Sequence, residues 1–267
     1  MQAPYSLPAP AEAHAGRTLV FDMNALPWQA TANPGLWLKP VRHDDTLGLY
    51  LGLVRFDAGT RSGLHQHQAV ATSFVVDGGL TDYHGSLRMH QAGINVKGST
   101  HDAISYQHTV LASRLEGPVL YPPSGEITGV HAGSRYGNFH NPDPDVPPEI
   151  NIEVDSLSYE ATGFAGVRRQ TIFDYAGTGT AHRMVQLTLR PGSVFAFRAG
   201  ALTEFWVRGG GVHVNGEVAD ANAFVVCEPG ATVEIDSPFG ALLLGWADAR
   251  EEGAGDLFGY LQAPVNP

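Results

Sequence analysis

Three histidines have the residue type and the spacing to hold one metal ion. His65 and His67 are separated by a single residue, in a stretch rich in β-forming residues. Because side chains alternate across a strand, both imidazoles should lie on one face, about 7 Å apart along it. His101 follows a turn and arrives from another predicted strand. Three imidazoles that converge from two strands could bind a single divalent ion.

This spacing resembles the cupin signature, which reads Gly-x5-His-x-His-x3-Glu-x6-Gly and, later, Gly-x2-His. The glutamate slot of the signature holds Ala71, with Thr72 beside it, so the match supplies three ligands out of four. The resemblance implies an all-β fold built from double-stranded β-helix, or jelly-roll, barrels. The residues that carry it are Gly59, His65, His67, Gly78, Gly98 and His101.

The composition agrees with a globular all-β protein. The chain has 267 residues, 43% hydrophobic and 16% charged, enough to bury one large core or two of ordinary size. Its 32 glycines and 18 prolines, set among short apolar runs, favour many turns. The formal net charge of −11 argues against nucleic acid or an anionic membrane surface as a partner.

The cysteine usage and the apolar runs bear on location. Cys227 is the single cysteine, so no internal disulfide can form and a reducing, cytoplasmic compartment is expected. The N-terminal segment has neither the basic nor the apolar part of a secretory signal, and the apolar runs are too short to span a bilayer. We therefore expect a protein that acts on a small molecule away from membranes.

An internal duplication predicts two tandem barrels. Residues 185–192 repeat the pattern of 53–59, and residues 204–211 repeat that of 71–78. Three landmarks share one offset, because 192 − 59, 204 − 71 and 211 − 78 all equal 133. The chain thus resembles a bicupin, with an arm at 1–17, a metal-binding barrel at 18–130, a linker at 131–150 and a second barrel at 151–262.

The second copy has lost the histidines. With the offset of 133, Arg198 and Gly200 stand in place of His65 and His67, and Val233 lies near the place of His101. Glu204 falls on the glutamate slot. Without imidazoles this barrel is expected to be degenerate and free of metal.

Three neutral imidazoles would leave a bound ion its full double charge and open coordination positions. Such a centre favours an anionic bidentate ligand, such as the enolate of a β-diketone or an α-hydroxyketone. Residues 98–118 are similar to the second motif of acetylacetone dioxygenase, of 2,4′-dihydroxyacetophenone dioxygenase and of the zinc-binding ChrR-type cupins. In the dioxygenases the resemblance implies iron ligands at His65, His67 and His101.

The sequence leaves several functions open. The first is an Fe(II)-dependent dioxygenase that cleaves a C–C bond of a small diketone or hydroxyketone, and Zn(II) or Mn(II) are alternative metals. The second is a non-catalytic metal-binding sensor of the ChrR type, and the third is a Zn-dependent isomerase, cyclase or lyase. A homodimer is expected from the edge strands of such barrels. No catalytic residue is assigned; neighbouring groups considered as auxiliary partners are Asp82, Tyr83, His84, His90, Tyr106, His108 and Glu116.

Overall fold

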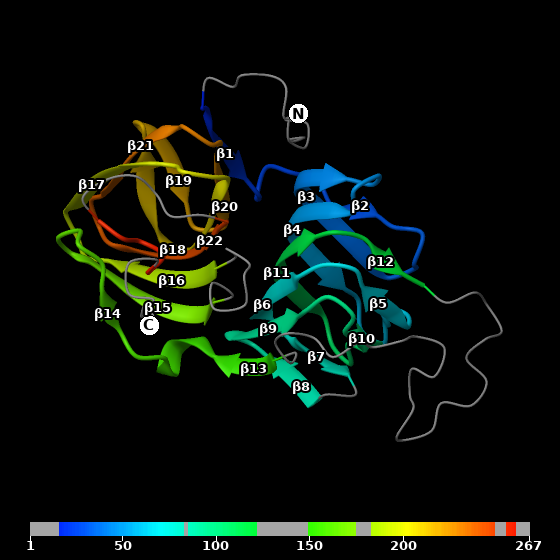
Figure 1. The fold of residues 1–267 in the computed structure, drawn as a ribbon. Coiled ribbons are helices and arrows are strands. Elements are labelled where there is room, and N and C mark those ends of the chain that lie inside the picture. The colour runs from blue at the N-terminus through cyan, green and yellow to red at the C-terminus, as the bar shows by residue number, and fades with distance from the viewer. Residues whose placement is uncertain (1–15, 83–84, 122–148, 175–182, 249–254, 260–267) are drawn as a thin grey trace, which may run out of the picture. The chain divides into compact units, whose positions relative to one another are not determined.

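The computed structural model describes residues 16–82, 85–121, 149–174, 183–248 and 255–259 (Figure 1). The described residues form β-strands and one short 3-10 helix, η1 (Val154–Ser156), with no α-helix among them. This confirms the predicted all-β class. In the same residues no helix has the length and the apolar character needed to cross a membrane.

The chain divides into two compact units, and the first includes Pro27–Asp155. Its largest sheet has seven antiparallel strands in the order β13-β9-β6-β11-β4-β3-β2. A three-stranded sheet has the order β10-β5-β12, and β7 pairs with β8 in a hairpin. The strands are β2 (Gln29–Ala30), β3 (Leu36–Asp44), β4 (Leu49–Phe56), β5 (His65–His67), β6 (Ala71–Asp77), β7 (Gly79–Asp82), β8 (Gly85–Arg88), β9 (Gln91–Asn95), β10 (Thr100–His101), β11 (Thr109–Glu116), β12 (Val119–Leu120) and β13 (Glu149–Glu153).

The second unit includes the chain from Ser156 onward and a short N-terminal segment. Its ten-stranded sheet follows the path β1-β20-β18-β22-β16-β15-β14, and β17, β19 and β21 pair off this path. The alternating burial of β17 shows how the strand turns one face to the core. The strands are β1 (Thr18–Asp22), β14 (Glu160–Ala161), β15 (Val167–Asp174), β16 (Arg183–Leu189), β17 (Ser193–Arg198), β18 (Thr203–Val214), β19 (Glu217–Asp220), β20 (Ala223–Cys227), β21 (Thr232–Ser237) and β22 (Ala241–Ala247).

The N-terminal strand lies in a different unit from the one that we expected. The first barrel was expected to begin at residue 18, whereas β1 pairs with β20 over its whole length. Arg17 adds an ion pair with Glu228 at 2.7 Å. Most of the predicted linker at 131–150 lies outside the described residues, and its last two residues open β13, which pairs with β9.

The two units share one pattern of strand pairing, which corrects the offset between them. His65 pairs with His101 on β5 and β10, and Phe197 pairs with Val233 on β17 and β21. Ala71 pairs with Asn95, and Thr203 pairs with Cys227. The differences 197 − 65, 233 − 101, 203 − 71 and 227 − 95 all equal 132.

The offset of 133 therefore fails by one residue in the strands that carry the site. The counterparts of His65, His67 and His101 in the second unit are Phe197, Ala199 and Val233, and all three belong to its apolar core. Thr203, not Glu204, occupies the position in the second unit that is equivalent to the glutamate slot at Ala71. Phe205 and Val207 belong to the core, so Glu204 lies on the other face of β18, where it is fully buried.

Aromatic rings fill the core of the second unit. Phe195 contacts Phe164 with ring centroids 5.1 Å apart, and Phe205 contacts Phe197 at 6.2 Å and Phe258 at 6.0 Å. Phe258 comes from the far C-terminal part of the described chain. Phe197, the counterpart of His65, thus belongs to a cluster of aromatic rings in the core of the second unit.

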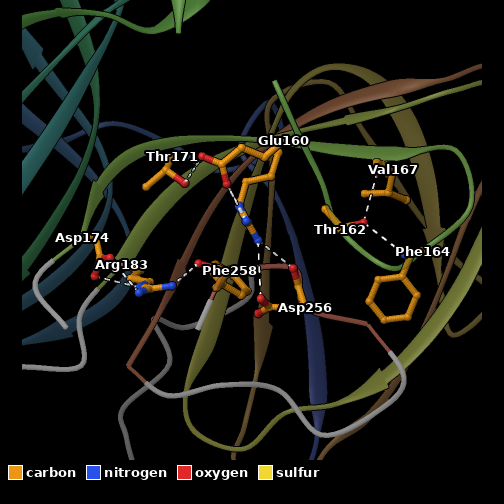
Figure 2. A network of polar contacts seen from close by, with 10 residues as sticks. Glu160, Thr162, Phe164, Val167, Thr171, Asp174, Arg183, Asp256 and Phe258 are labelled. Atoms are coloured by element: carbon orange, nitrogen blue, oxygen red, sulfur yellow. Dashed lines mark hydrogen bonds and ion pairs between the residues drawn. The ribbon is translucent and has the colours of Figure 1, made fainter. Parts of the chain in front are cut away.

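Two buried arginines hold Phe258 in this position (Figure 2). Arg169 on β15 donates from Nη1 to the carbonyl oxygen of Asp256 at 2.8 Å. Arg183 on β16 donates from Nη1 to the carbonyl oxygen of Phe258 at 2.9 Å, and its Nε and Nη2 donate to Asp174 at 2.8 and 2.7 Å. These charged donors bind backbone carbonyls of a segment that lies outside the strands.

Replacing Phe258 should destabilise the second unit. Phe258→Ala removes a fully buried ring from a closed apolar core, and we expect a loss of about 3–5 kcal/mol in the free energy of unfolding. Urea denaturation measures this change. The matched control is Phe239→Ala, whose ring is 90% exposed and should change stability by less than about 0.5 kcal/mol. Equal effects of the two variants would contradict this account of the core.

Candidate metal site

Strand pairing brings the three predicted histidines together. β5 lies between β10 and β12, with His65 opposite His101 and His67 opposite Val119. The rings of His65 and His67 lie 4.9 Å apart between centroids, and that of His101 lies 4.5 and 5.1 Å from them. Among the described residues this is the group of histidine, cysteine and carboxylate side chains that could hold a metal ion, and it contains no carboxylate.

The Nε2 atoms are the groups that face one another. Nε2 of His101 lies 3.0 Å from Nε2 of His65 and 3.1 Å from Nε2 of His67. An imidazole nitrogen binds Zn²⁺ at about 2.0–2.1 Å, so two nitrogens at a right angle about one ion are separated by about 3.0 Å. Both spacings to His101 therefore fit imidazoles that share one metal ion, and the three ligand atoms all lie within 4.8 Å of one another.

Hydrogen bonds at the opposite ring nitrogens select the tautomer. Nδ1 of His65 lies 2.7 Å from the carbonyl oxygen of Gly63, and Nδ1 of His101 lies 3.0 Å from Oδ2 of Asp82. Both oxygens only accept, so each Nδ1 carries the proton and each Nε2 presents a lone pair. Gly63 has φ +81°, a conformation that glycine adopts without the strain of a Cβ.

Burial keeps His65 and His67 neutral. It lowers the pKa of His65 to about 3, and the nearby His101 ring adds to this shift. Burial also lowers the pKa of His67 well below its ordinary value, followed by the effects of His101 and His65. His65 and His67 are only 6% and 5% exposed to solvent. A neutral imidazole is the form that binds a metal, so the site is prepared for a cation.

A cavity of about 380 Å³ opens onto the histidines. Its volume lies in the range of small-molecule pockets. Ala71 lines it, so the position of the missing glutamate is part of the open space. The wall is mainly apolar, with polar residues that include Ser73, Asn95 and Ser113 and the carboxylates of Asp44 and Asp45. The apolar members include Leu36, Leu38, Val54, Phe56, Leu80, Leu111 and Leu115.

Of the auxiliary candidates, Asp82 is the one that contacts a histidine ligand candidate. Glu116 instead pairs with Arg114 at 2.9 Å, and Tyr106 is 73% exposed. His90 lies near Asp155, at 3.5 Å, and His108 is exposed. Tyr83 and His84 lie outside the described residues.

Sequence reasoning did not single out Tyr121 or Asn95. The ring of Tyr121 lies 5.6 Å from that of His65, half-exposed, and both line the cavity. Asn95 reaches the cavity from the end of β9, directly opposite Ala71. Asn95 could have been recognised as a polar residue on the inward face of a strand. That face is known only once the pairing register between β6 and β9 is known.

Comparisons with known proteins agree with this geometry. Residues 16–120 match the family model described as the ChrR Cupin-like domain. This part of the chain belongs to the cupin superfamily. No curated protein sequence matches it.

Solved cupin structures share the fold at low sequence identity. A candidate dioxygenase from Nostoc punctiforme has a TM-score of 0.67 and 13% identity, over 90% of this chain and 85% of that one. Salicylate 1,2-dioxygenase from Pseudaminobacter salicylatoxidans has a TM-score of 0.60 and 15% identity, over 90% and 86%. Oxalate decarboxylase from Bacillus subtilis, a protein with Mn(II) centres, has a TM-score of 0.58 and 11% identity, over 94% and 81%. At these identities the similarity is one of fold.

A divalent metal should stabilise this cupin through the three histidines. At 100 times its dissociation constant, Zn(II) would add about 2.7 kcal/mol, and the melting temperature should rise by several degrees. Differential scanning fluorimetry with and without the metal measures the shift. His101→Ala should abolish it, and Asp82→Asn should weaken metal binding by about 10- to 100-fold, because the imidazole loses its charged acceptor.

The control for this experiment is His108→Ala, which removes an exposed imidazole from the same unit. This variant should keep the full metal-induced shift. A shift that survives in His101→Ala, or one that disappears in His108→Ala, would show that the metal binds elsewhere.

The metal-stripped protein should lose stability as the pH falls from about 6.5 toward 3. Above pH 6.5 His65 is neutral in the folded and the unfolded chain. Below pH 6.5 the imidazole of His65 binds a proton in the unfolded chain but stays neutral in the folded protein, since its pKa there is about 3. The free energy of unfolding then falls by up to about 1.4 kcal/mol per pH unit from this group.

Urea denaturation at pH 7, 6 and 5 tests this effect. His65→Gln removes the titrating ring, so its stability should depend less steeply on pH than that of the wild type. His108→Gln, an exposed control, should keep the wild-type slope. Parallel slopes for His65→Gln and the wild type would contradict the neutral, buried imidazole.

Proposed function

We propose that this cupin is a metal-dependent dioxygenase that uses Fe(II) to cleave a C–C bond of a small diketone or hydroxyketone. The observation that carries the proposal is the set of three Nε2 atoms, with those of His65 and His67 3.0 and 3.1 Å from that of His101, at the wall of a largely apolar cavity. An Fe(II) ion held there would supply Lewis acidity and the electron chemistry of a reaction with dioxygen.

The neutral ligand set suits an enolate substrate. Ala71 provides no carboxylate, so His65, His67 and His101 would leave the full positive charge of the ion to lower the pKa of the substrate's carbon acid. Asp82 holds the proton of His101 at Nδ1 and keeps Nε2 available. The apolar wall excludes water from the bound substrate, which strengthens electrostatic attraction between the enolate and the cation.

The reaction balances without an external reductant. The enolate of the ketone supplies the electrons, dioxygen accepts them, and the C–C bond beside the carbonyl breaks. Both oxygen atoms enter the two products, a carboxylic acid and a second carbonyl compound or acid. The residues of the site therefore need only to bind and orient the substrate and to hold the metal.

We further propose that the two units are the two jelly-roll barrels of a bicupin and that the second has a structural role. The shared pairing pattern at an offset of 132 supports a duplication. Phe197, Ala199 and Val233 occupy the histidine positions there and give a metal no ligand. Substrate binding is then confined to the first unit.

A non-catalytic metal sensor is the second candidate. The match of residues 16–120 to the ChrR Cupin-like domain favours it. The cavity of about 380 Å³ favours the dioxygenase, because a structural or sensing site has no need of a substrate-sized space beside the metal. The two functions differ in their response to oxygen.

Oxygen uptake tests the dioxygenase. Protein reconstituted with Fe(II) should consume oxygen when acetylacetone or dihydroxyacetophenone is added. For each O2 consumed, one acid should appear from acetylacetone and two acids from dihydroxyacetophenone. His101→Ala should lower the rate by more than about 100-fold, because a ligand matters at least as much as the group that orients it. An oxygen electrode and product analysis by chromatography give both quantities.

His108→Ala serves as the control and should retain the rate of the wild type. A Fe(II)-loaded protein that binds diketones and hydroxyketones without consuming oxygen would contradict the dioxygenase. A protein that binds Zn(II), is inert to oxygen and is retained by a protein partner would support the sensor instead.

A further inference from the structure

The side chain of Asn95 is an unsatisfied polar group inside the first unit. Its Oδ1 atom is buried and has no hydrogen-bond partner. A buried amide oxygen without a donor is unfavourable, and such groups are rare in native proteins unless they serve a ligand or a water. Asn95 lines the cavity that holds His65, His67 and His101.

Two serines extend this polar region across the neighbouring strands. Ser73 on β6 and Ser113 on β11 lie opposite each other, and their Oγ atoms are 2.9 Å apart. One of the two protons is used between them, and the other remains available to a third group. On its other side β6 pairs with β9, where Ala71 lies opposite Asn95 and Ser73 lies opposite Gly93. Small side chains at 71 and 93 therefore leave the amide and the hydroxyls uncovered.

A small side pocket gives these groups a defined shape. It has a volume of about 40 Å³ and is lined by Ser73, Asn95, Asp82 and His101, with apolar contacts from Leu80 and Leu87. One water molecule takes up about 30 Å³ in the liquid, so the pocket has room for one group of that size. It lies beside the ring of His101, next to the candidate metal.

The charges around the pocket select against an anion. Neither the main cavity nor the side pocket has a lysine or an arginine among its described lining residues. The carboxylate of Asp82 lines the side pocket and is 9% exposed. A second anionic group in this space would be repelled, whereas a neutral donor would satisfy Oδ1 of Asn95.

We propose that Asn95 and Ser73 form a specificity subsite that receives one neutral hydroxyl group of the substrate. A hydroxyl can donate to Oδ1 of Asn95 and accept from the free serine proton, whereas a ketone oxygen cannot donate and would leave Oδ1 unpaired. The inference rests on the proposed function and refines it. The substrate is a ketone that binds the metal through its enolate and carries a separate hydroxyl group on an apolar body.

Binding of two matched probes tests the subsite without turnover. Acetylacetone and 1-hydroxypentane-2,4-dione differ by one hydroxyl, and isothermal titration of each into Zn(II)-loaded protein gives the affinity ratio. The wild type should bind the hydroxylated probe about tenfold more tightly or better, the effect of one hydrogen bond to a buried group. Asn95→Leu, of similar shape, should bring the ratio to within about twofold of unity, and Ser73→Ala should lower it in part.

Ser86→Ala is the matched control. Ser86 bonds to Thr81 at 3.1 Å and does not line either cavity, so this variant should keep the wild-type ratio. A wild type without preference, or a preference that persists in Asn95→Leu, would overturn the subsite. Preference for the hydroxylated probe in a protein that consumes no oxygen would refute the dioxygenase and leave the subsite standing.

Stability provides a second readout that needs no metal. Asn95→Leu replaces an unpaired buried amide with an apolar side chain, so the melting temperature of the metal-free protein should rise by a few degrees. A fall in the melting temperature would show that the amide has a structural partner, and this result would overturn the proposal.

Discussion

Three lone pairs that point at one another inside a protein repel unless a positive charge lies between them. In this chain the Nε2 atoms of His65, His67 and His101 lie close together, and bonds to Gly63 and Asp82 on the far side of the rings of His65 and His101 turn two of the lone pairs inward. A proton between two of the nitrogens would relieve part of the repulsion, but burial disfavours a charged imidazole at His65 and His67. A divalent cation offsets the desolvation through three bonds at once, which a single proton cannot do. The polar contacts around the three histidines of the first unit can therefore be understood as the support for a cation between their nitrogens.

The second unit shows the same strand pairing without this requirement. Phe197 pairs with Val233 where His65 pairs with His101, and both join an apolar core. The stability of that core then comes from ring packing and from the C-terminal Phe258, whose carbonyl is bound by Arg183. One set of backbone hydrogen bonds can thus support a polar, cation-binding interior or a closed aromatic one. The choice lies in a few inward-facing residues of β5, β10, β17 and β21.

Much of the site could be predicted from the sequence because it depends on local spacing. The separation of His65 from His67 fixes their common face, and the glycine-bounded position of His101 indicates a neighbouring strand. The repeated pattern was also visible, but the predicted offset of 133 was wrong by one residue in the strands of the site. Gly59 and Gly192 do differ by 133, whereas Gly78 finds its counterpart in Gly210, with φ +78° and +73°. Because side chains alternate along a strand, this single step moved Glu204 from the inner to the outer face. Asp82 was named among several neighbouring groups but could not be chosen from them, and Asn95 was not named at all, since the roles of both depend on which residues face them across strands.

The absence of a glutamate at position 71 has a consequence beyond the metal charge. In a strand pair the side chain at 71 is the direct neighbour of Asn95, and a long carboxylate there would cover the amide and provide its own acceptors to the ion. Alanine leaves both the cation and Oδ1 of Asn95 open to the same cavity. The two features are therefore linked: a site that gives up a fourth protein ligand gains room for a ligand that can reach the metal and the polar wall together. A cavity with one strongly attractive point discriminates poorly between small chelating molecules. A second point, fixed on a different strand at a set position, adds a geometric condition that only a correctly substituted molecule meets.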